Sequence, residues 1–322
     1  MVQTELLGIF EGYGDFFLVP PHPEIQSIFN ADVSAALASA RIVRKVFFGV
    51  PLNKLQIEYK EDETPKTIAD TEGDAAILKA LRKLRPHDNL LLEETGYHQG
   101  LPNLHPVTST TVRHYADSLD GSRPFIEGKP WSTVGVGATQ ENGDYLTGVI
   151  VHPYRQSMGV AVRGLGAYLI PLNGRLLPTA GFKAQRLYVS QKDSLTGGTV
   201  SIDSLFPIKN KEMRVMKHNL MMELENMGVT SYDMVGSNIA YQLDVAMGRS
   251  ILGFTDAVGG PWDWRVGEAL INEAGGVMLD VLTGKKPTDL SEALVYGNKT
   301  VVDQVLPHAH RIYWGFRGFD PK

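Results

Sequence analysis

The stretch that most constrains this chain runs from Tyr115 to Phe125 and reads YADSLDGSRPF. Its aspartates, Asp117 and Asp120, follow an apolar, β-prone run and precede a turn-forming Asp-Gly pair, so we expect both carboxylates at the end of a strand. Carboxylates beside a free backbone carbonyl form a hard oxygen donor set, which suits Mg²⁺ better than Zn²⁺. An ordinary hairpin turn with solvated carboxylates is the competing interpretation.

Three other stretches place acids in comparable positions. LLLEETG is an apolar strand that ends in Glu93 and Glu94, and KEDETPKTIADTEGD places Asp70 at the mouth of a helix. GGPWDWRVGEALINEAGG places Asp263 in the first turn of another helix. Both helix-start acids also have a purely structural interpretation, because a carboxylate there caps backbone N–H groups and is favoured by the helix macrodipole.

In this order, the acidic stretches resemble the inositol monophosphatase-like superfamily of metal-dependent, lithium-sensitive phosphatases. Its pattern is a Lys before SPVTxAD, a GEE-like pair, DPxDGT, and WDxAA followed by EAGG. The resemblance extends from about Lys60 to Val302. It implies an α/β fold with an α+β N-terminal part, layered as an α-β-α-β-α sandwich. It also implies Mg²⁺-dependent hydrolysis of a small phosphate monoester.

The resemblance implies two or three Mg²⁺ ions in each active site. Glu93, Asp117 and the Leu119 carbonyl would hold the first ion. Asp117, Asp120 and Asp263 would hold the second, with Asp117 bridging the two. A third, weaker ion would use Glu93 and water. Two metal ions about 4 Å apart neutralise the phosphate, lower the pKa of a bound water and stabilise the leaving oxygen.

The implied catalytic residues are Asp70, Ser122 and Glu93. Asp70 and Ser122 would orient and deprotonate the attacking water. Gly121 and Ser122 would also present backbone N–H groups to the phosphate at a helix N-terminus.

The implied substrate contacts farther along the chain are Gly236, Ser237 and Asp256. Asp256 stands where the inositol-phosphatase branch has a Glu that accepts hydrogen bonds from substrate hydroxyls. It keeps the acceptor but is one methylene shorter. A turn aspartate near Gly259 and Gly260 is the alternative interpretation of the same residue.

Departures from the family pattern bear on the substrate. Ser118 replaces the usual Pro, and Ser122 replaces Thr, which keeps the hydroxyl but loses the methyl group that restricts its rotamer. Trp264 and Arg265 replace small residues, and Arg265 could face solvent, pair with an acid or touch substrate. We expect an inositol phosphate or a related polyol or sugar phosphate. The alternatives are a 3′(2′),5′-bisphosphate nucleotidase, a histidinol-phosphate phosphatase, a fructose-1,6-bisphosphatase, or a non-catalytic sensor of phosphate ligands.

Composition excludes several other classes of protein. The net charge of -5 argues against a nucleic-acid partner held by phosphate contacts. The absence of cysteine excludes disulfides, thiolate metal sites and a cysteine nucleophile. No segment approaches the roughly 20 apolar residues of a membrane span, and the N-terminus lacks the basic region of a signal peptide. We therefore expect a cytoplasmic protein without a membrane partner.

A composition shift at residues 181–186 predicts two domains. The first, residues 1–185, is an α+β domain that carries most of the metal ligands. The second, residues 186–322, is an α/β domain that carries Asp263 and the specificity residues. Strands are expected at 187–190 and 199–202, and a helix with a methionine-rich core stripe is expected at 211–227.

The C-terminal stretch HAHRIYWGFRGF carries His308 and His310 among aromatic residues. No third ligand lies near them in the sequence, so packing or a subunit contact is a better interpretation than a metal site. The resembled family is usually dimeric, and we expect a homodimer.

Overall fold

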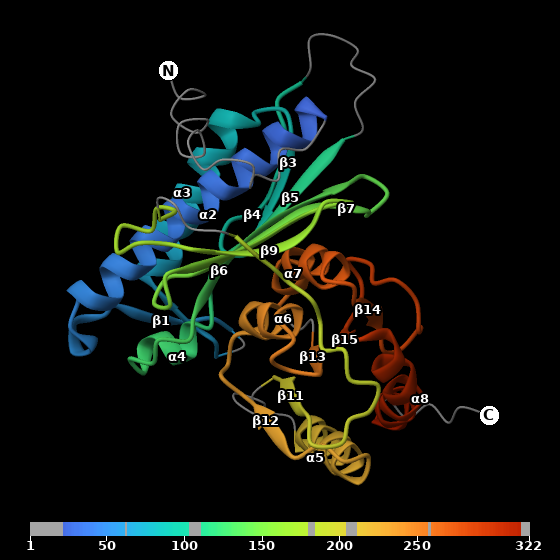
Figure 1. The fold of residues 1–322 in the computed structure, drawn as a ribbon. Helices are drawn as coiled ribbons and strands as arrows, with labels where there is room; N and C mark the ends of the chain where they lie inside the picture. The colour runs from blue at the N-terminus through green and yellow to red at the C-terminus, as the bar shows by residue number, and fades with distance from the viewer. Residues whose placement is uncertain are drawn as a thin grey trace.

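The computed structural model describes residues 22–61, 63–102, 111–179, 184–203, 211–256 and 259–316. Figure 1 shows two sheets with helices above, between and below them, which is the expected layered α-β-α-β-α sandwich. Among these residues, no helix combines the length and apolar character that crossing a membrane requires.

The larger sheet, eight-stranded within the described residues, forms the upper half of Figure 1. Its strands are β3 (Asn89–Leu92), β4 (Gly96–His98), β5 (Val112–Asp120), β6 (Thr133–Gln140), β7 (Tyr145–His152), β8 (Ser157–Val162), β9 (Gly166–Pro171) and β10 (Gln185–Arg186). Their spatial order is β10-β9-β8-β7-β6-β5-β3-β4. β3 runs parallel to β5, whereas β5 to β9 form an antiparallel meander, so the carboxyl ends of β3 and β5 lie side by side.

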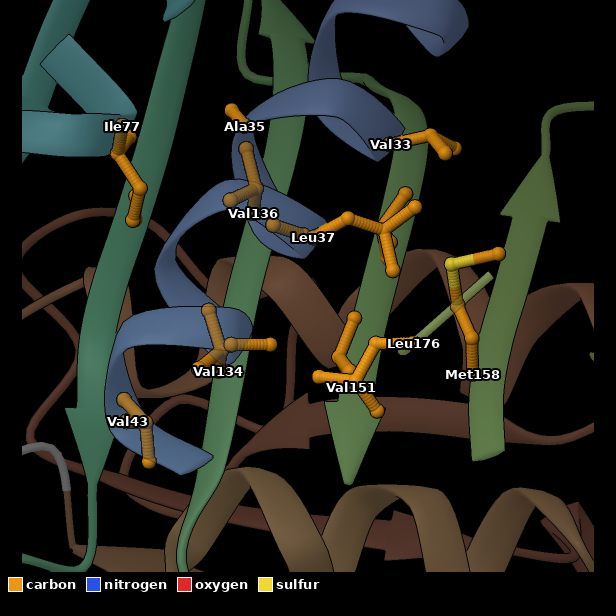
Figure 2. Close-up of a cluster of buried hydrophobic side chains, with 14 of the residues drawn as sticks. Val33, Ala35, Leu37, Val43, Ile77, Val134, Val136, Val151, Met158 and Leu176 are labelled. Carbon is orange, nitrogen blue, oxygen red and sulfur yellow. The ribbon is translucent and has the colours of Figure 1, made fainter. Parts of the chain in front are cut away.

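Two helices, α2 (Pro23–Gly49) and α3 (Ile68–Leu84), cover the outer face of this sheet (Figure 1). The apolar residues of α2 recur at helical spacing, and its Leu37 and Val43 pack against Val136 and Val134 of β6 and Val151 of β7 (Figure 2). Between the two helices lie the short η2 (Leu52–Lys54) and a hairpin of β1 (Ile57–Tyr59) and β2 (Pro65–Thr67).

The smaller sheet contains, in the described part of the chain, β11 (Thr199–Ile202), β12 (Ser231–Asp233), β13 (Leu252–Asp256), β14 (Val277–Asp280) and β15 (Ala293–Gly297). Helices α6 (Asn238–Ala246) and α7 (Trp262–Glu273) lie between the two sheets, while α5 (Lys211–Asn226) and α8 (Lys299–Phe316) pack on the far face of the smaller one (Figure 1). The middle helix layer therefore contacts both sheets. It brings Asp263, in the first turn of α7, close to β5.

A sequence-based expectation for one element is wrong. Residues 187–190 are not a strand, because the Leu187 N–H still donates to Ala167 of β9 but the Val189 N–H donates to the Ala274 carbonyl at the end of α7. The histidine-containing C-terminal stretch continues α8 as far as Phe316. His308 there contacts Glu223 of α5, and the packing interpretation is confirmed.

Candidate active site

The two aspartates of the central stretch are buried in strand β5 and are not in a solvated hairpin turn. Asp117 is 2% exposed and Asp120 is 7% exposed. Residues three apart on a regular strand point to opposite faces, but the pairing of β5 with β6 shifts register between these two aspartates. The shift allows both carboxylates to contribute charge to one cluster.

Gly121 ends the strand in the left-handed region, with φ of 90°. A Cβ atom there would lie 3.0 Å from the Gly236 carbonyl oxygen and 3.1 Å from the Ser237 Cβ. Only glycine combines that backbone conformation with this close approach. The chain then enters α4 (Ser122–Ile126), a short helix and not the second strand of a hairpin.

Glu93 reaches the same place from the neighbouring strand. It follows β3, and its backbone N–H donates to the Ala116 carbonyl at 3.1 Å, continuing the pairing with β5. Lys60 Nζ lies 2.7 Å from Glu93 Oε1 and 2.7 Å from Glu94 Oε1. Lys66 Nζ lies 2.6 Å from the other Glu94 oxygen, so Glu94 holds the β1–β2 hairpin against the end of β3.

Helix α6 presents its N-terminus to Asp120. Ser237 Oγ accepts from the Ala240 N–H, so Ser237 is the N-cap of α6, and its hydroxyl also donates to Asp120 Oδ2. The Ile239 N–H donates to the same oxygen at 2.7 Å. Asp120 therefore ties the larger sheet to the middle helix layer, a role that its position in the sequence did not indicate.

Asp263 lies in the first turn of α7 and is 8% exposed. A Cβ atom on Gly259 would come within 2.4 Å of its Oδ2, so a side chain there would displace the carboxylate. Burial and the charges of Glu93 and Asp120 raise the pKa of Asp263 well above its usual range, whereas Lys60 opposes that rise. Asp263 therefore belongs to the same electrostatic cluster as the β3 and β5 acids.

The cluster carries more negative charge than the nearby lysine neutralises. Burial, followed by repulsion from Glu93, Asp120 and Asp263, raises the pKa of Asp117 well above its usual range. Burial also raises the pKa of Asp120 to about 6, despite the hydrogen bonds from α6. Carboxylates that are held close together and away from water repel one another when charged. A divalent cation bound to them removes that repulsion.

With the side chains as they stand, no three or more His, Cys, Asp or Glu residues of the described chain form a group that could hold a metal ion. Asp120 is turned toward α6, and Glu93 is paired with Lys60. The donor types suit a hard cation, and ion binding would require these side chains to turn from their present partners.

A second polar pair borders the cluster. Ser122 Oγ donates to Asp70 Oδ1 at 2.6 Å and lies 3.2 Å from the Leu119 carbonyl oxygen. The other Asp70 oxygen accepts from the Thr67 N–H at 2.7 Å in a capping box at the start of α3. The interpretation of Asp70 as the N-cap is therefore wrong in position, because Thr67 is the N-cap and Asp70 is the N3 residue of the capping box. One oxygen remains for Ser122.

The pKa of Asp70 also differs from that of a free aspartate. Burial raises its pKa to about 6, although the hydrogen bonds from Ser122 and Thr67 oppose that rise. At neutral pH the carboxylate is therefore mostly charged and can accept a proton.

The expected substrate contacts are only partly defined. Gly236, with φ of 79°, donates its N–H to the Tyr241 hydroxyl oxygen at 2.7 Å, and Ser237 contacts Asp120 as described. The backbone of Asp256 ends β13 opposite Ala293, and its side chain lies outside the described part of the structure.

A model of the inositol monophosphatase family matches residues 24–312 of this chain. The chain belongs to that family. The fold and the positions of the acidic stretches agree with this membership.

Two curated relatives illustrate the range of names within the inositol monophosphatase family. "Nus factor SuhB" of Escherichia coli K12 is 31% identical over 279 residues, which cover 87% of this chain and 94% of the relative. "Inositol-1-monophosphatase" of Mesorhizobium japonicum is 29% identical over 280 residues, which cover 87% of this chain and 95% of the relative.

Solved structures support the same inositol monophosphatase fold. The extragenic suppressor protein SuhB of Bartonella henselae superposes with a TM-score of 0.73 at 22% identity, covering 88% of this chain and 98% of that one. The Thermotoga maritima IMPase superposes with a TM-score of 0.70 at 21% identity, covering 88% and 97% of the two chains.

Proposed function

We propose that this protein is a Mg²⁺-dependent phosphatase that hydrolyses a small phosphate monoester, an inositol phosphate or a related polyol or sugar phosphate. The observation that carries the proposal is the cluster of carboxylates that β3, β5 and α7 bring together, in which Asp117, Asp120 and Asp263 are buried and Glu93 is partly exposed. Membership in the inositol monophosphatase family supports the same activity.

The cation ligands in this proposal are the side chains of Glu93, Asp117, Asp120 and Asp263 with the Leu119 carbonyl, holding two or three ions. When bound, such ions neutralise phosphate oxygens and acidify water. The chain's own contribution is to hold these oxygens in a largely dry place, so that charge introduced there is weakly screened.

Asp70 and Ser122 would position and deprotonate the attacking water. The 2.6 Å hydrogen bond between them fixes the serine hydroxyl, and the raised Asp70 pKa suits a base that works near neutral pH. Gly121 and Ser122 would contact the phosphate through backbone N–H groups. Ser237, Gly236 and Asp256 would contact the rest of the substrate.

The alternative functions differ from this proposal in the substrate or in the absence of catalysis. A 3′(2′),5′-bisphosphate nucleotidase or a histidinol-phosphate phosphatase would use the same carboxylates on a different leaving group. A non-catalytic role is the remaining alternative, because relatives of this chain carry the name Nus factor. The four acids and the Asp70–Ser122 pair favour catalysis, since a sensor of phosphate ligands has no need of a base.

Phosphate release from a panel of phosphorylated polyols, nucleotides and histidinol phosphate tests the proposal, with Mg²⁺ present or removed by chelation. Asp117→Asn should abolish Mg²⁺-dependent turnover, because it removes the charge at the centre of the cluster. Glu127→Gln, on the exposed end of α4, is the control and should retain activity. Near-normal hydrolysis by Asp117→Asn would contradict the proposed site.

Two further properties follow from the same family resemblance. Lithium should inhibit hydrolysis uncompetitively, and the protein should be a homodimer. Phosphate release in the presence of LiCl tests the first, and light scattering at micromolar protein tests the second.

A further inference from the structure

Arg265, one of the departures from the family pattern, is a buried cation that pairs with acids. It lies in α7, two residues after Asp263, and its side chain is 4% exposed. The guanidinium donates through Nη1 to Glu268 Oε2 at 2.8 Å and through Nε to Asp289 Oδ1 at 2.8 Å. It also lies 4.2 Å above the Trp264 ring. Pairing with an acid is therefore the confirmed alternative.

Asp289 connects this arginine to strand β5. Its second oxygen, Oδ2, accepts from the Tyr115 hydroxyl at 2.8 Å and from Arg113 Nη1 at 3.2 Å. Tyr115 precedes Asp117 by two residues, so the two side chains share one face of the strand. A chain of hydrogen bonds, Arg265 to Asp289 to Tyr115, thus links α7 to β5 next to the acid cluster.

The bridge lies between the two elements that carry these acids. Asp263 on α7 is buried, as are Asp117 and Asp120 on β5, so contacts between α7 and β5 decide where the Asp263 carboxylate lies. The Arg265 guanidinium, which is planar and always protonated, bonds both Glu268 and Asp289 at once. The middle residue of the bridge, Asp289, then holds Tyr115 in place.

We infer that Arg265, Asp289 and Tyr115 form a positioning bridge that sets the place of the Asp263 carboxylate relative to those of β5. The inference rests on the proposed function only in that the positioned carboxylates bind Mg²⁺. Because no member of the bridge needs to touch metal or substrate, its loss lowers metal affinity without removing a ligand.

The test uses substitutions that remove single contacts from the bridge. Tyr115→Phe removes one hydroxyl, and Asp289→Asn removes one charge at nearly constant size. Arg265→Lys serves as a third variant, because full truncation of Arg265 would leave the buried Glu268 unpaired and could prevent folding. Lys286→Gln is the matched control, since Lys286 donates to the Gly143 carbonyl as Arg265 does but pairs with Asp144.

Each bridge variant should bind Mg²⁺ about 10-fold more weakly by calorimetry, the lower end of the usual cost of losing a residue that orients a metal ligand. The Tyr115→Phe/Asp289→Asn double variant should lose no more than the worse single variant, because both changes break one bridge. In metal-free protein, the amides of Asp263 and Trp264 should exchange hydrogen faster. At saturating Mg²⁺, kcat should return close to that of the wild type.

Unchanged Mg²⁺ affinity and unchanged exchange, with only a lower Tm, would reduce the bridge to a packing feature and overturn the inference. Additive losses in the double variant would do the same. A wild-type protein that binds Mg²⁺ but hydrolyses no phosphate ester would sink the proposed function alone. If the wild type binds no Mg²⁺, the exchange rates of the metal-free variants still decide whether the bridge holds α7.

Discussion

At single residues, the proposed mechanism gives the Asp70–Ser122 pair a role in proton transfer and none in cation binding. Ser122→Ala removes the donor to Asp70 Oδ1, and Asp70→Asn removes the base. Each should lower kcat by about 10²–10⁴-fold with little change in Mg²⁺ affinity. The double variant should be no worse than the worse single variant, because the two residues act as a unit.

Asp74→Asn is the matched control for this pair. Asp74 lies one turn farther along α3 and is equally buried, but it accepts from Thr95 Oγ1 at 2.7 Å. The Asp74→Asn variant should retain most of the activity in single-turnover assays of phosphate release. A loss equal to that of Asp70→Asn would assign the effect to the helix and not to proton transfer.

Among the elements, helix α6 has the clearest separable role. Ser237→Ala removes both the N-cap of α6 and a hydrogen bond to Asp120, and should lower the free energy of unfolding by about 1–3 kcal/mol. The half-saturating Mg²⁺ concentration should also fall, because Asp120 loses a hydrogen-bond donor that competes with the ion for its carboxylate.

Ser231→Ala provides the comparison for this prediction. Ser231 lies at the start of β12 and contacts Thr199 Oγ1 at 2.6 Å, away from the acid cluster. Denaturant unfolding and Mg²⁺ titration should show clear differences between Ser237→Ala and Ser231→Ala in the free energy of unfolding and in the half-saturating Mg²⁺ concentration. Equal stability of Ser237→Ala and wild type would show that the cap contributes nothing to α6.

For the whole molecule, a buried charged histidine should make stability depend on pH. His114 Nδ1 lies 2.6 Å from Asp32 and its Nε2 lies 2.9 Å from Asp88, which joins α2, β5 and the segment after α3. Burial favours the neutral ring, but the two carboxylates outweigh it and raise the His114 pKa from 6.5 to about 9.

The direction of the pH effect follows from this raised pKa. The stabilisation is fully present below pH 6.5 and is lost as pH rises through 9, by about 3 kcal/mol in the free energy of unfolding. Burial lowers the pKa of His152 to about 3, so His152 affects stability only below pH 6.5. Denaturant unfolding between pH 6.5 and 9.5 checks the prediction, and His114→Gln should flatten the dependence. Parallel curves for the two proteins would refute it.

Much of the active-site cluster was predictable because its members follow local rules. Glu93 ends an apolar strand, Asp117 and Asp120 precede a glycine that must adopt positive φ, and Asp263 lies in a helix start. The resemblance to a known family then supplied the expected roles, and those roles stay predictions. The contacts of Ser237 with Asp120 and of Asp289 with Tyr115 had no local signal, since their partners lie more than a hundred residues apart.

The sequence by itself determined most of the strands and helices and which of them carry acids, because hydrophobic period, turn residues and helix starts act over a few neighbours. Only the tertiary structure decided how those acids meet. The parallel pairing of β3 with β5 and the packing of α7 between the sheets bring four acidic side chains together, and burial of three of them, Asp117, Asp120 and Asp263, raises their pKa values. The tertiary structure also decided the role of Arg265, because Asp289, its partner in the bridge, contacts it only in the folded chain.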